Sequence, residues 1–299
     1  MEASIFIKTW RLHRMKRLYI QPTTYSIYTF QQGENPYITD TPINKQRAHR
    51  QYKTMIEKFQ HPAVFSIEAN KGNAPLSDIV FAASAGVCLP RLPETLVLLP
   101  SMKYPHRKLE LPYLRTIFKE LELKTVDFPQ DLHAPFEGQA ELKWFAGGKK
   151  AICGYGQRST KKTVALLQTI LQDIYASYGL RPPELLPVHL KSDLFYHLDL
   201  AMLEFDDTKC ILHEGAFSLK TIRSIQDFLG ASNVHMLDTK DLFCLNAVID
   251  GPHLITHTLK EKGLKKVLET LTGRTVVETN MSEFELSGGS VRCMSMDIF

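Results

Sequence analysis

Paired cysteines are absent from this sequence. Its 299 residues contain five cysteines, an odd number, and no two of them stand in the CxxC spacing. That pattern argues against a disulfide framework and against a structural zinc site, and it favours a reducing compartment. We therefore expect a cytoplasmic protein without a metal site. The cysteines are Cys88, Cys153, Cys210, Cys244 and Cys293.

Long apolar runs and linkers are also missing. No stretch approaches the ~20 apolar residues that a membrane helix needs, and the start has no signal-peptide core. No Gly/Ser-rich linker or low-complexity segment marks a domain boundary. A chain of 299 residues, 44% of them hydrophobic, can bury the core of one large domain or of two modest ones. Without a boundary we expect a single domain over residues 18–299, and no membrane partner.

The net charge of +4 comes from basic residues that are mostly scattered. Their densest cluster is Arg11, His13, Arg14, Lys16 and Arg17. Such a run can touch nucleic acid or a membrane surface, but it is more often a solvated extension. No basic stripe with interleaved aromatic residues follows, which argues against a nucleic-acid partner. We expect a basic N-terminal extension over residues 1–17.

One unit recurs along the chain: a β-rich run, a short turn, a second β-rich run and a helical pattern. Five such units of roughly fifty residues fit a closed, pseudo-symmetric arrangement in which each unit covers its neighbour. An ordinary α/β sandwich is the alternative. The β-rich pairs are expected at 78–99, 141–157, 196–213, 242–258 and 284–298, and the helices at 44–59, 112–124, 161–178, 219–229 and 259–271.

A glycine turn near the C-terminus presents one cysteine. It reads Gly288-Gly289-Ser290-Val291-Arg292-Cys293, and His197-Leu198-Asp199 stands upstream. Glycines let the backbone hold the following residues tightly beside a ligand, and a cysteine there can act as a thiolate nucleophile. Taken alone, a lone cysteine is more often a small buried hydrophobe.

Four motifs together resemble the guanidino-group-modifying enzymes, in that family's order. They are Phe136–Leu142 (FEGQAEL), Gly154–Thr160 (GYGQRST), His197–Asp199 and Gly288–Met294. The family comprises arginine deiminases, arginine dihydrolases, dimethylarginine dimethylaminohydrolases and amidinotransferases. The resemblance implies the pentein fold, a five-bladed pseudo-symmetric α/β propeller, and this agrees with the five units.

Two further segments extend the resemblance over nearly the whole chain from about residue 18. Asp78-Ile79-Val80-Phe81, followed by Ala85-Gly86, resembles the first active-site segment of the family. Gln21–Tyr25 through Asn35-Pro36 is similar to the opening of the dihydrolase-like branch.

The resemblance implies a catalytic role for three residues. Cys293 would attack the guanidinium carbon and form a covalent amidino-thioether. His197 would protonate the leaving amine and then take a proton from water, and Glu137 would orient that histidine. The substrate would be bound by Asp199 at the guanidinium and by Arg158 at the carboxylate. The remaining expected substrate contacts are Asp78, Ser84, Arg107 and Asn35.

Each of these residues also has an ordinary structural explanation. His197 is then a core histidine, Glu137 a turn carboxylate, Asp199 a strand-edge charge and Arg158 a residue at a helix start. An aspartate such as Asp78 before a β-rich run is often a turn residue. The matched order of all the motifs favours the catalytic interpretation.

The sequence departs from the family at the guanidinium site. Ser84 stands where deiminases and dimethylaminohydrolases have a second aspartate and the dihydrolase-like branch has asparagine. Ala83 replaces an acidic residue of the dimethylaminohydrolases, and the run Gly138-Gln139-Ala140-Glu141 differs from the family's glycine-rich run. One fewer negative charge weakens the hold on a cation, which argues against plain deiminase activity. The pattern favours a changed substrate choice over a dead enzyme.

We expect a cofactor-free hydrolase that acts on the guanidino or ureido carbon of an arginine-like amino acid. The products would be citrulline or ornithine, with ammonia. The alternatives are an amidinotransferase that uses the same intermediate, a dimethylarginine dimethylaminohydrolase, or a non-catalytic pentein that binds a ligand. The expected partner is the small-molecule substrate, and a homo-oligomer is left open.

Overall fold

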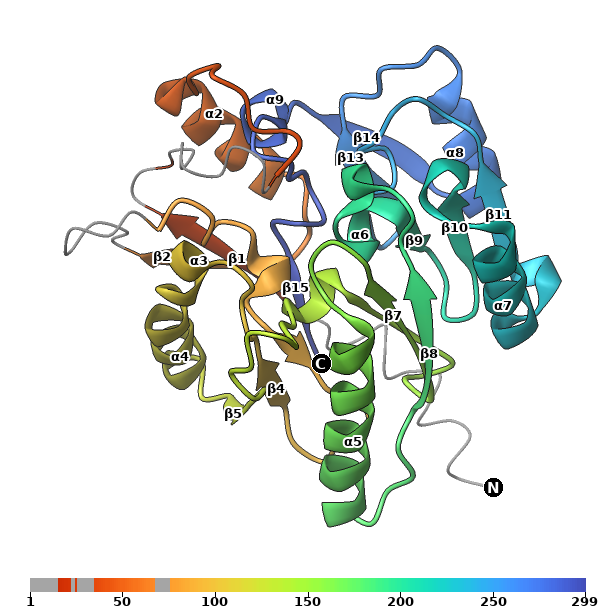
Figure 1. The fold of residues 1–299 in the computed structure, drawn as a ribbon. Coiled ribbons are helices and arrows are strands. Elements are labelled where there is room, and N and C mark those ends of the chain that lie inside the picture. The colour runs from red at the N-terminus through yellow and green to blue at the C-terminus, as the bar shows by residue number, and fades with distance from the viewer. Residues whose placement is uncertain (1–15, 23–24, 26–34, 68–75) are drawn as a thin grey trace.

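The computed structural model describes residues 16–22, 25, 35–67 and 76–299, and these form five three-stranded sheets of one design (Figure 1). In each sheet the central strand pairs antiparallel with one neighbour and parallel with the other. The sheets are β15-β1-β2, β3-β4-β5, β6-β7-β8, β9-β10-β11 and β12-β13-β14. The architecture is the expected α/β pentein propeller.

The strands in chain order are β1 (Lys16–Pro22), β2 (Pro62–Ile67), β3 (Val87–Cys88), β4 (Leu96–Leu99), β5 (Lys124–Asp127), β6 (Leu142–Phe145), β7 (Lys150–Tyr155), β8 (Glu184–His189), β9 (Met202–Glu204), β10 (Cys210–His213), β11 (Val234–Leu237), β12 (Val248–Asp250), β13 (His253–His257), β14 (Thr275–Thr279) and β15 (Met296–Ile298).

A helix lies between the central and the third strand of every sheet, because two parallel strands need a crossover connection. These crossover helices are α2 (Lys45–Ile56), α4 (Leu111–Glu120), α5 (Lys161–Ser177), α7 (Leu219–Leu229) and α8 (Leu264–Thr272). The shorter helical turns are α3 (Pro105–Lys108), α6 (Leu198–Ala201), α9 (Ser282–Glu285), η2 (Ala82–Ser84), η3 (Gly138–Ala140), η4 (Asp193–Phe195), η5 (Glu214–Ala216) and η6 (Ala231–Asn233). The third strand of each unit was not expected from the sequence. No helix within the described ranges is long and apolar enough to cross a membrane.

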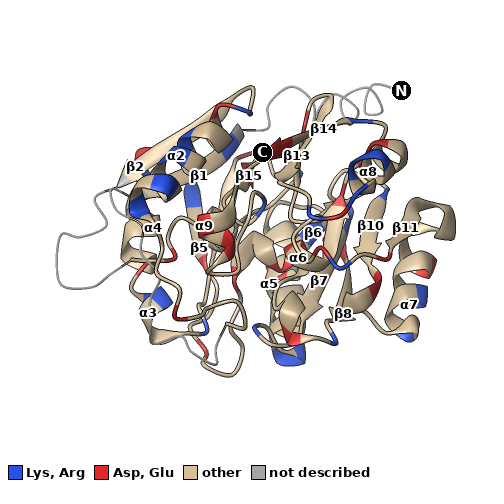
Figure 2. Cartoon of the chain, turned by 90° about the horizontal axis from the view of Figure 1, so that it is seen from above, with Lys and Arg blue, Asp and Glu red and all other residues tan. Residues whose placement is uncertain are grey.

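The crossover helices follow the expected ranges where local capping signals are strong. Helix α5 begins at the capping box of Thr160 and Thr163, and α2 begins after the side-chain cap of Asn44. Helix α8 instead begins at Leu264, after the expected residue 259, because Gly263 adopts a left-handed φ of 85°. Figure 2 shows lysine and arginine gathered on the outer side of α2.

Apolar clusters bridge neighbouring sheets, so that each unit covers the next. Leu98 of β4, Cys153 of β7 and Leu167 of α5 belong to one buried cluster. The hydroxyl of Tyr175, also on α5, donates to the carbonyl of Pro90 at 2.6 Å. A helix therefore stabilises its own sheet and the preceding one.

The expectation of a strand pair at 284–298 is wrong in its first half. That part forms α9 and the glycine turn, and β15 pairs with the N-terminal strand, Lys16 opposite Ile298 and Leu18 opposite Met296. The ring of sheets closes where β1, the first described strand, pairs with β15, the last strand (Figure 1). Because β1 begins at Lys16, both Lys16 and Arg17 of the expected basic extension belong to this sheet, and residues 1–15 lie outside the described residues.

Six buried or mostly buried charges of alternating sign connect four of the five sheets. Running across the interior, they are Asp250, Arg17, Asp297, Arg292, Glu204 and Lys143, and successive members lie 2.9 to 3.0 Å apart. Burial acts to raise the pKa of Asp297, but Arg292 and Arg17 hold it far below its usual range. Removing one partner of such a pair typically costs about 3–5 kcal/mol, since the other charge stays buried.

Gly138→Ala tests how tightly η3 packs on η2. Gly138 has a φ of +63°, and an added Cβ would lie 2.6 Å from the carbonyl oxygen of Gly86. Gly179 has a similar φ of +66°, but no described atom lies within 4 Å of its added Cβ. We expect Gly138→Ala to lower the free energy of unfolding in urea by ~1–3 kcal/mol more than Gly179→Ala. Equal losses would contradict this packing.

Candidate active site

A short turn precedes the first strand of every sheet, and the five turns converge on one pocket. We call them the pre-strand turns; they cover residues 82–84, 137–140, 197–201, 243–246 and 290–295. Ser84, Asp199 and Cys293 hold matching places, three residues before β3, β9 and β15 begin at Val87, Met202 and Met296. The repeated unit therefore gathers polar residues from distant parts of the chain.

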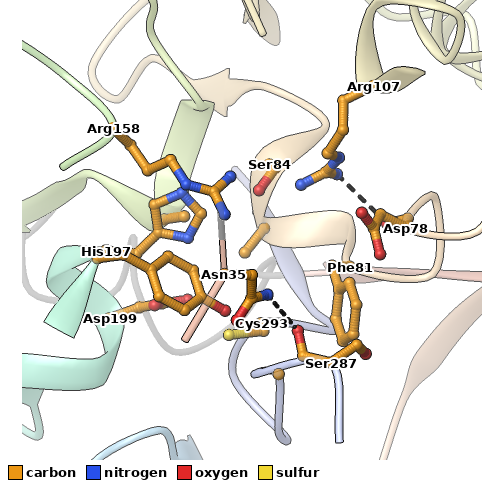
Figure 3. Close-up of a pocket in the computed structure, with 14 residues that line it drawn as sticks. Asn35, Asp78, Phe81, Ser84, Arg107, Arg158, His197, Asp199, Ser287 and Cys293 are labelled. Atoms are coloured by element: carbon orange, nitrogen blue, oxygen red, sulfur yellow. Dashed lines mark hydrogen bonds between the residues drawn. The ribbon is translucent and has the colours of Figure 1, made fainter. Parts of the chain in front are cut away.

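The pocket and the solvent at its opening together contain about 350 Å³ of empty space, and Figure 3 shows the side chains that line it. Eight of the nine residues expected from the sequence line it, and Glu137 lies directly behind His197. The lining residues are Asn35, Asp78, Phe81, Ala83, Ser84, Arg107, Ala140, Arg158, Tyr196, His197, Asp199, Ser287, Gly289 and Cys293. No group of metal-ligating side chains occurs among the described residues.

Glu137 contacts both His197 and Arg158 from outside the pocket lining. Its Oε2 lies 2.7 Å from His197 Nε2 and 3.1 Å from Arg158 Nη1. Burial acts to raise the pKa of Glu137, yet Arg158 and His197 hold it well below the usual range. An ionised Glu137 fixes the proton of His197 on Nε2 and leaves Nδ1 free of that carboxylate.

Arg158, the expected carboxylate-binding residue, and Arg107, an expected substrate contact, are both paired with buried glutamates. Arg158 also lies between the rings of Tyr104 and Tyr196, with its guanidinium carbon 4.6 and 4.7 Å from their centres. Arg107 donates two hydrogen bonds to Glu110, at 2.9 and 3.0 Å. These contacts hold the guanidinium planes rigidly at the pocket.

Cys293 and Asp199 lie together at the pocket floor. Burial raises the pKa of the Cys293 thiol well above its usual value, and the charge of Asp199 raises it further. Neither oxygen of the buried Asp199 carboxylate accepts a hydrogen bond from a nitrogen or hydroxyl donor of the described residues. The pocket floor thus holds a protonated thiol beside a carboxylate that lacks nitrogen and hydroxyl donors among the described residues. A cation placed there would favour the thiolate.

The remaining expected residues form the pocket rim. Asn35 donates to the carbonyl of Ser287 at 2.8 Å, and Asp78 lies 3.4 Å from His106 Nε2. Ser84 is buried in η2 and faces the same space (Figure 3). Of the segment that resembles the dihydrolase opening, Thr23, Thr24 and residues 26–34 lie outside the described residues.

Sequence reasoning missed Asn246 and Glu141. Asn246 contacts Cys293 directly, and the one signal for it was a polar residue inside the apolar run 243–248. Glu141 lies 3.8 Å from His197 Nε2 and accepts from Ser159 at 3.1 Å. Burial, and then the charge of Glu137, raise the pKa of Glu141 well above the usual value, which favours its neutral form beside an ionised neighbour.

No protein-family model matches the chain. An uncharacterised protein of Caenorhabditis elegans is 26% identical over 285 residues, which cover 94% of this chain and 93% of that protein. The bifunctional arginine dihydrolase/ornithine cyclodeaminase ArgZ of Synechocystis is 27% identical over 262 residues. That match covers 85% of this chain but 34% of ArgZ, so the chain spans about a third of that relative.

The solved structures show the same architecture. The N-terminal domain of ArgZ, in a cysteine-to-serine mutant bound to substrate, superimposes with a TM-score of 0.78 at 23% identity. The superposition covers 95% of this chain and 98% of that one. The repeated sheets and these structures show that the chain has the pentein fold, and the order of the motifs and these relatives support its placement with the guanidino-group-modifying enzyme superfamily.

Proposed function

We propose that this protein is a cysteine-dependent hydrolase that acts on the guanidino or ureido carbon of arginine or a related amino acid, and releases ammonia. The observation that carries the proposal is the pair at the pocket floor. A buried carboxylate that accepts from no nitrogen or hydroxyl donor of the described residues stands beside a thiol, and His197, which is hydrogen-bonded to Glu137, lines the same pocket.

Substrate binding would activate the nucleophile. A guanidinium cation can donate N–H groups to the two oxygens of Asp199, which satisfies that carboxylate. Its positive charge would then lie beside Cys293 and offset the effects of burial and of Asp199 on the thiol pKa. The thiolate therefore forms mainly when a cation is bound, and without one the thiol of Cys293 stays mostly protonated.

The chemistry then proceeds in two steps. The proton of Cys293 passes to His197, and Sγ attacks the guanidinium carbon. The C–N bond breaks as His197 returns the proton to the leaving amine, which departs as ammonia and leaves an amidino-thioether. His197 next takes a proton from water, the hydroxyl adds to the same carbon, and the C–S bond breaks to release the product and the thiolate.

The α-carboxylate of an amino-acid substrate would lie against Arg158, with Arg107 lining the same pocket. A planar guanidinium provides the paired donors that a carboxylate accepts. The similarity to ArgZ, which is an arginine dihydrolase, supports an amino-acid substrate of this class. An assay of arginine, methylated arginines and citrulline, with detection of ammonia and amino-acid products, tests the proposal as a whole.

Cys293→Ser should abolish turnover and leave the thermal midpoint close to that of the parent, since serine is smaller by little and equally neutral. A small thiol alkylator should label Cys293 ahead of the other four cysteines in peptide mass spectra, because those four do not line the pocket. An active serine variant, or equal labelling of all five cysteines, would exclude Cys293 as the nucleophile.

Agmatine, which lacks the α-carboxylate of arginine, tests the role of Arg158. If Arg158 binds that group, agmatine should show a kcat/KM lower by about 10- to 100-fold, the size of a charge-assisted contact. Arg158→Lys should raise KM for arginine while changing agmatine turnover much less. Efficient agmatine turnover by the parent would contradict this assignment.

Ser84 should set the choice between cationic and neutral substrates. A serine hydroxyl donates to a ureido oxygen or accepts from a guanidinium nitrogen, but it adds no charge. Ser84→Asp should improve binding of arginine relative to citrulline by ~1–3 kcal/mol. Ser84→Asn should move the product ratio from citrulline toward ornithine. If both variants keep the parent's substrate ranking and product ratio, Ser84 does not face the substrate.

A further inference from the structure

Asn246 is fully buried in the pre-strand turn before β12, and its side chain makes four hydrogen bonds. Its Oδ1 accepts from the backbone N–H groups of Arg292 and Cys293, at 3.0 and 3.1 Å. Its Nδ2 donates to the carbonyl of Asp199 at 3.2 Å and to Cys293 Sγ at 3.0 Å. A primary amide can form two bonds at each end, so this one is saturated.

These partners determine which way the amide points. Backbone N–H groups can only donate, so the oxygen of Asn246 must face Arg292 and Cys293. The carbonyl of Asp199 can only accept, so the NH₂ group must face it. A flipped amide would place donor against donor and acceptor against acceptor. The N–H that points at Cys293 Sγ is therefore fixed by the protein.

Asn246 also lies in a repeated element of the fold, the pre-strand turn. The other four pre-strand turns carry Ser84, Glu137, His197 with Asp199, and Cys293. Asn246 stands in the fifth, two residues before β12 begins at Val248. The side chains of these four turns line the pocket or, for Glu137, contact His197. The side chain of the fifth turn, Asn246, does not line the pocket but contacts Cys293.

Asn246 acts on a sulfur whose surroundings otherwise oppose ionisation. Burial and Asp199 both raise the pKa of Cys293, while the Ser290 backbone and the Asn246 side chain lower it. A neutral amide donor favours the thiolate without adding a positive charge that would compete with a guanidinium for Asp199. This suits a site that must accept a cation.

We propose that Asn246 is a positioning residue for the nucleophile: it holds the Cys293 turn through Oδ1 and stabilises the Cys293 thiolate through Nδ2. The proposal rests on the proposed function for its catalytic meaning. Its effect on the sulfur, however, can be measured without any turnover.

Asn246→Asp replaces the NH₂ group with oxygen and keeps the size and the acceptor. It also adds a negative charge that by itself raises the pKa of Cys293, so the uncharged Asn246→Ser variant decides the test. The rate of Cys293 alkylation by iodoacetamide is followed from pH 6 to 10, with the labelled peptide identified by mass spectrometry. We expect the apparent pKa of Cys293 to rise by about one unit or more, and kcat to fall about 10- to 100-fold, with a smaller change in KM. Asn246→Ser, which shortens the side chain away from Sγ, should shift the alkylation profile in the same direction.

Thr256→Val is the matched control. Thr256 is also fully buried in the same unit, and its hydroxyl donates to the carbonyl of Cys244 at 3.3 Å, away from the pocket lining. It should lose stability without a shift of the alkylation profile. The serine variant still carries the test if the aspartate variant does not fold, as judged by circular dichroism.

The proposal is overturned if a folded Asn246 variant keeps the parent's alkylation profile, whether or not turnover falls. A loss of turnover with an unchanged profile would assign Asn246 a purely structural role. Failure of the proposed function looks different: the unaltered protein would then turn over no guanidino or ureido amino acid. The alkylation profiles would still decide the role of Asn246.

Discussion

A ring of five contacts between neighbouring pre-strand turns is the constraint on which the pocket depends. Each contact joins one sheet to the next, so the position of every polar group is set by both neighbours. In order around the ring they are Ala83 N to Cys293 O at 2.9 Å, Gln139 N to Gly86 O at 2.9 Å, His197 Nε2 to Glu137 Oε2 at 2.7 Å, Asn246 Nδ2 to Asp199 O at 3.2 Å, and Cys293 N to Asn246 Oδ1 at 3.1 Å. Because the ring is closed only when β15 pairs with β1, the nucleophile reaches its place only in the complete fold.

Charge is balanced nearly everywhere around this ring. The two pocket arginines are paired with Glu137 and Glu110, and a chain of alternating charges satisfies the interior between the sheets. Asp199 is the exception, since its carboxylate is buried and accepts no nitrogen or hydroxyl donor of the described residues. Buried polar groups are normally hydrogen-bonded, so an exception calls for an explanation. A cationic guanidinium would supply the missing donors and the missing charge together.

The same balance gives a physical meaning to the departures at Ala83 and Ser84. Both residues line the pocket, and neither carries the charge found there in other branches of the family. With fewer carboxylates at the guanidinium position, Asp199 and Asp78 remain as the pocket-lining acidic side chains among the described residues. The loss of a carboxylate weakens the binding of a neutral ureido group less than it weakens the binding of a cationic guanidinium. The proposed site is therefore suited to amino acids with either a cationic guanidinium or a neutral ureido group.

The sequence by itself determined the repeated unit and most of the residues that meet at the pocket, because strand alternation, capping and ordered motifs are local signals. Helix α7 begins and ends at the expected residues, and Cys293, His197 and Arg158 converge as their motifs implied. Three features follow from the tertiary structure alone: β15 pairs with β1, Asn246 contacts Cys293, and the pKa of Glu141 is raised behind His197. Pairing between the chain ends, the burial of one amide and the pKa of a carboxyl all depend on groups distant in sequence. A local pattern of residues does not show which groups distant in sequence come into contact.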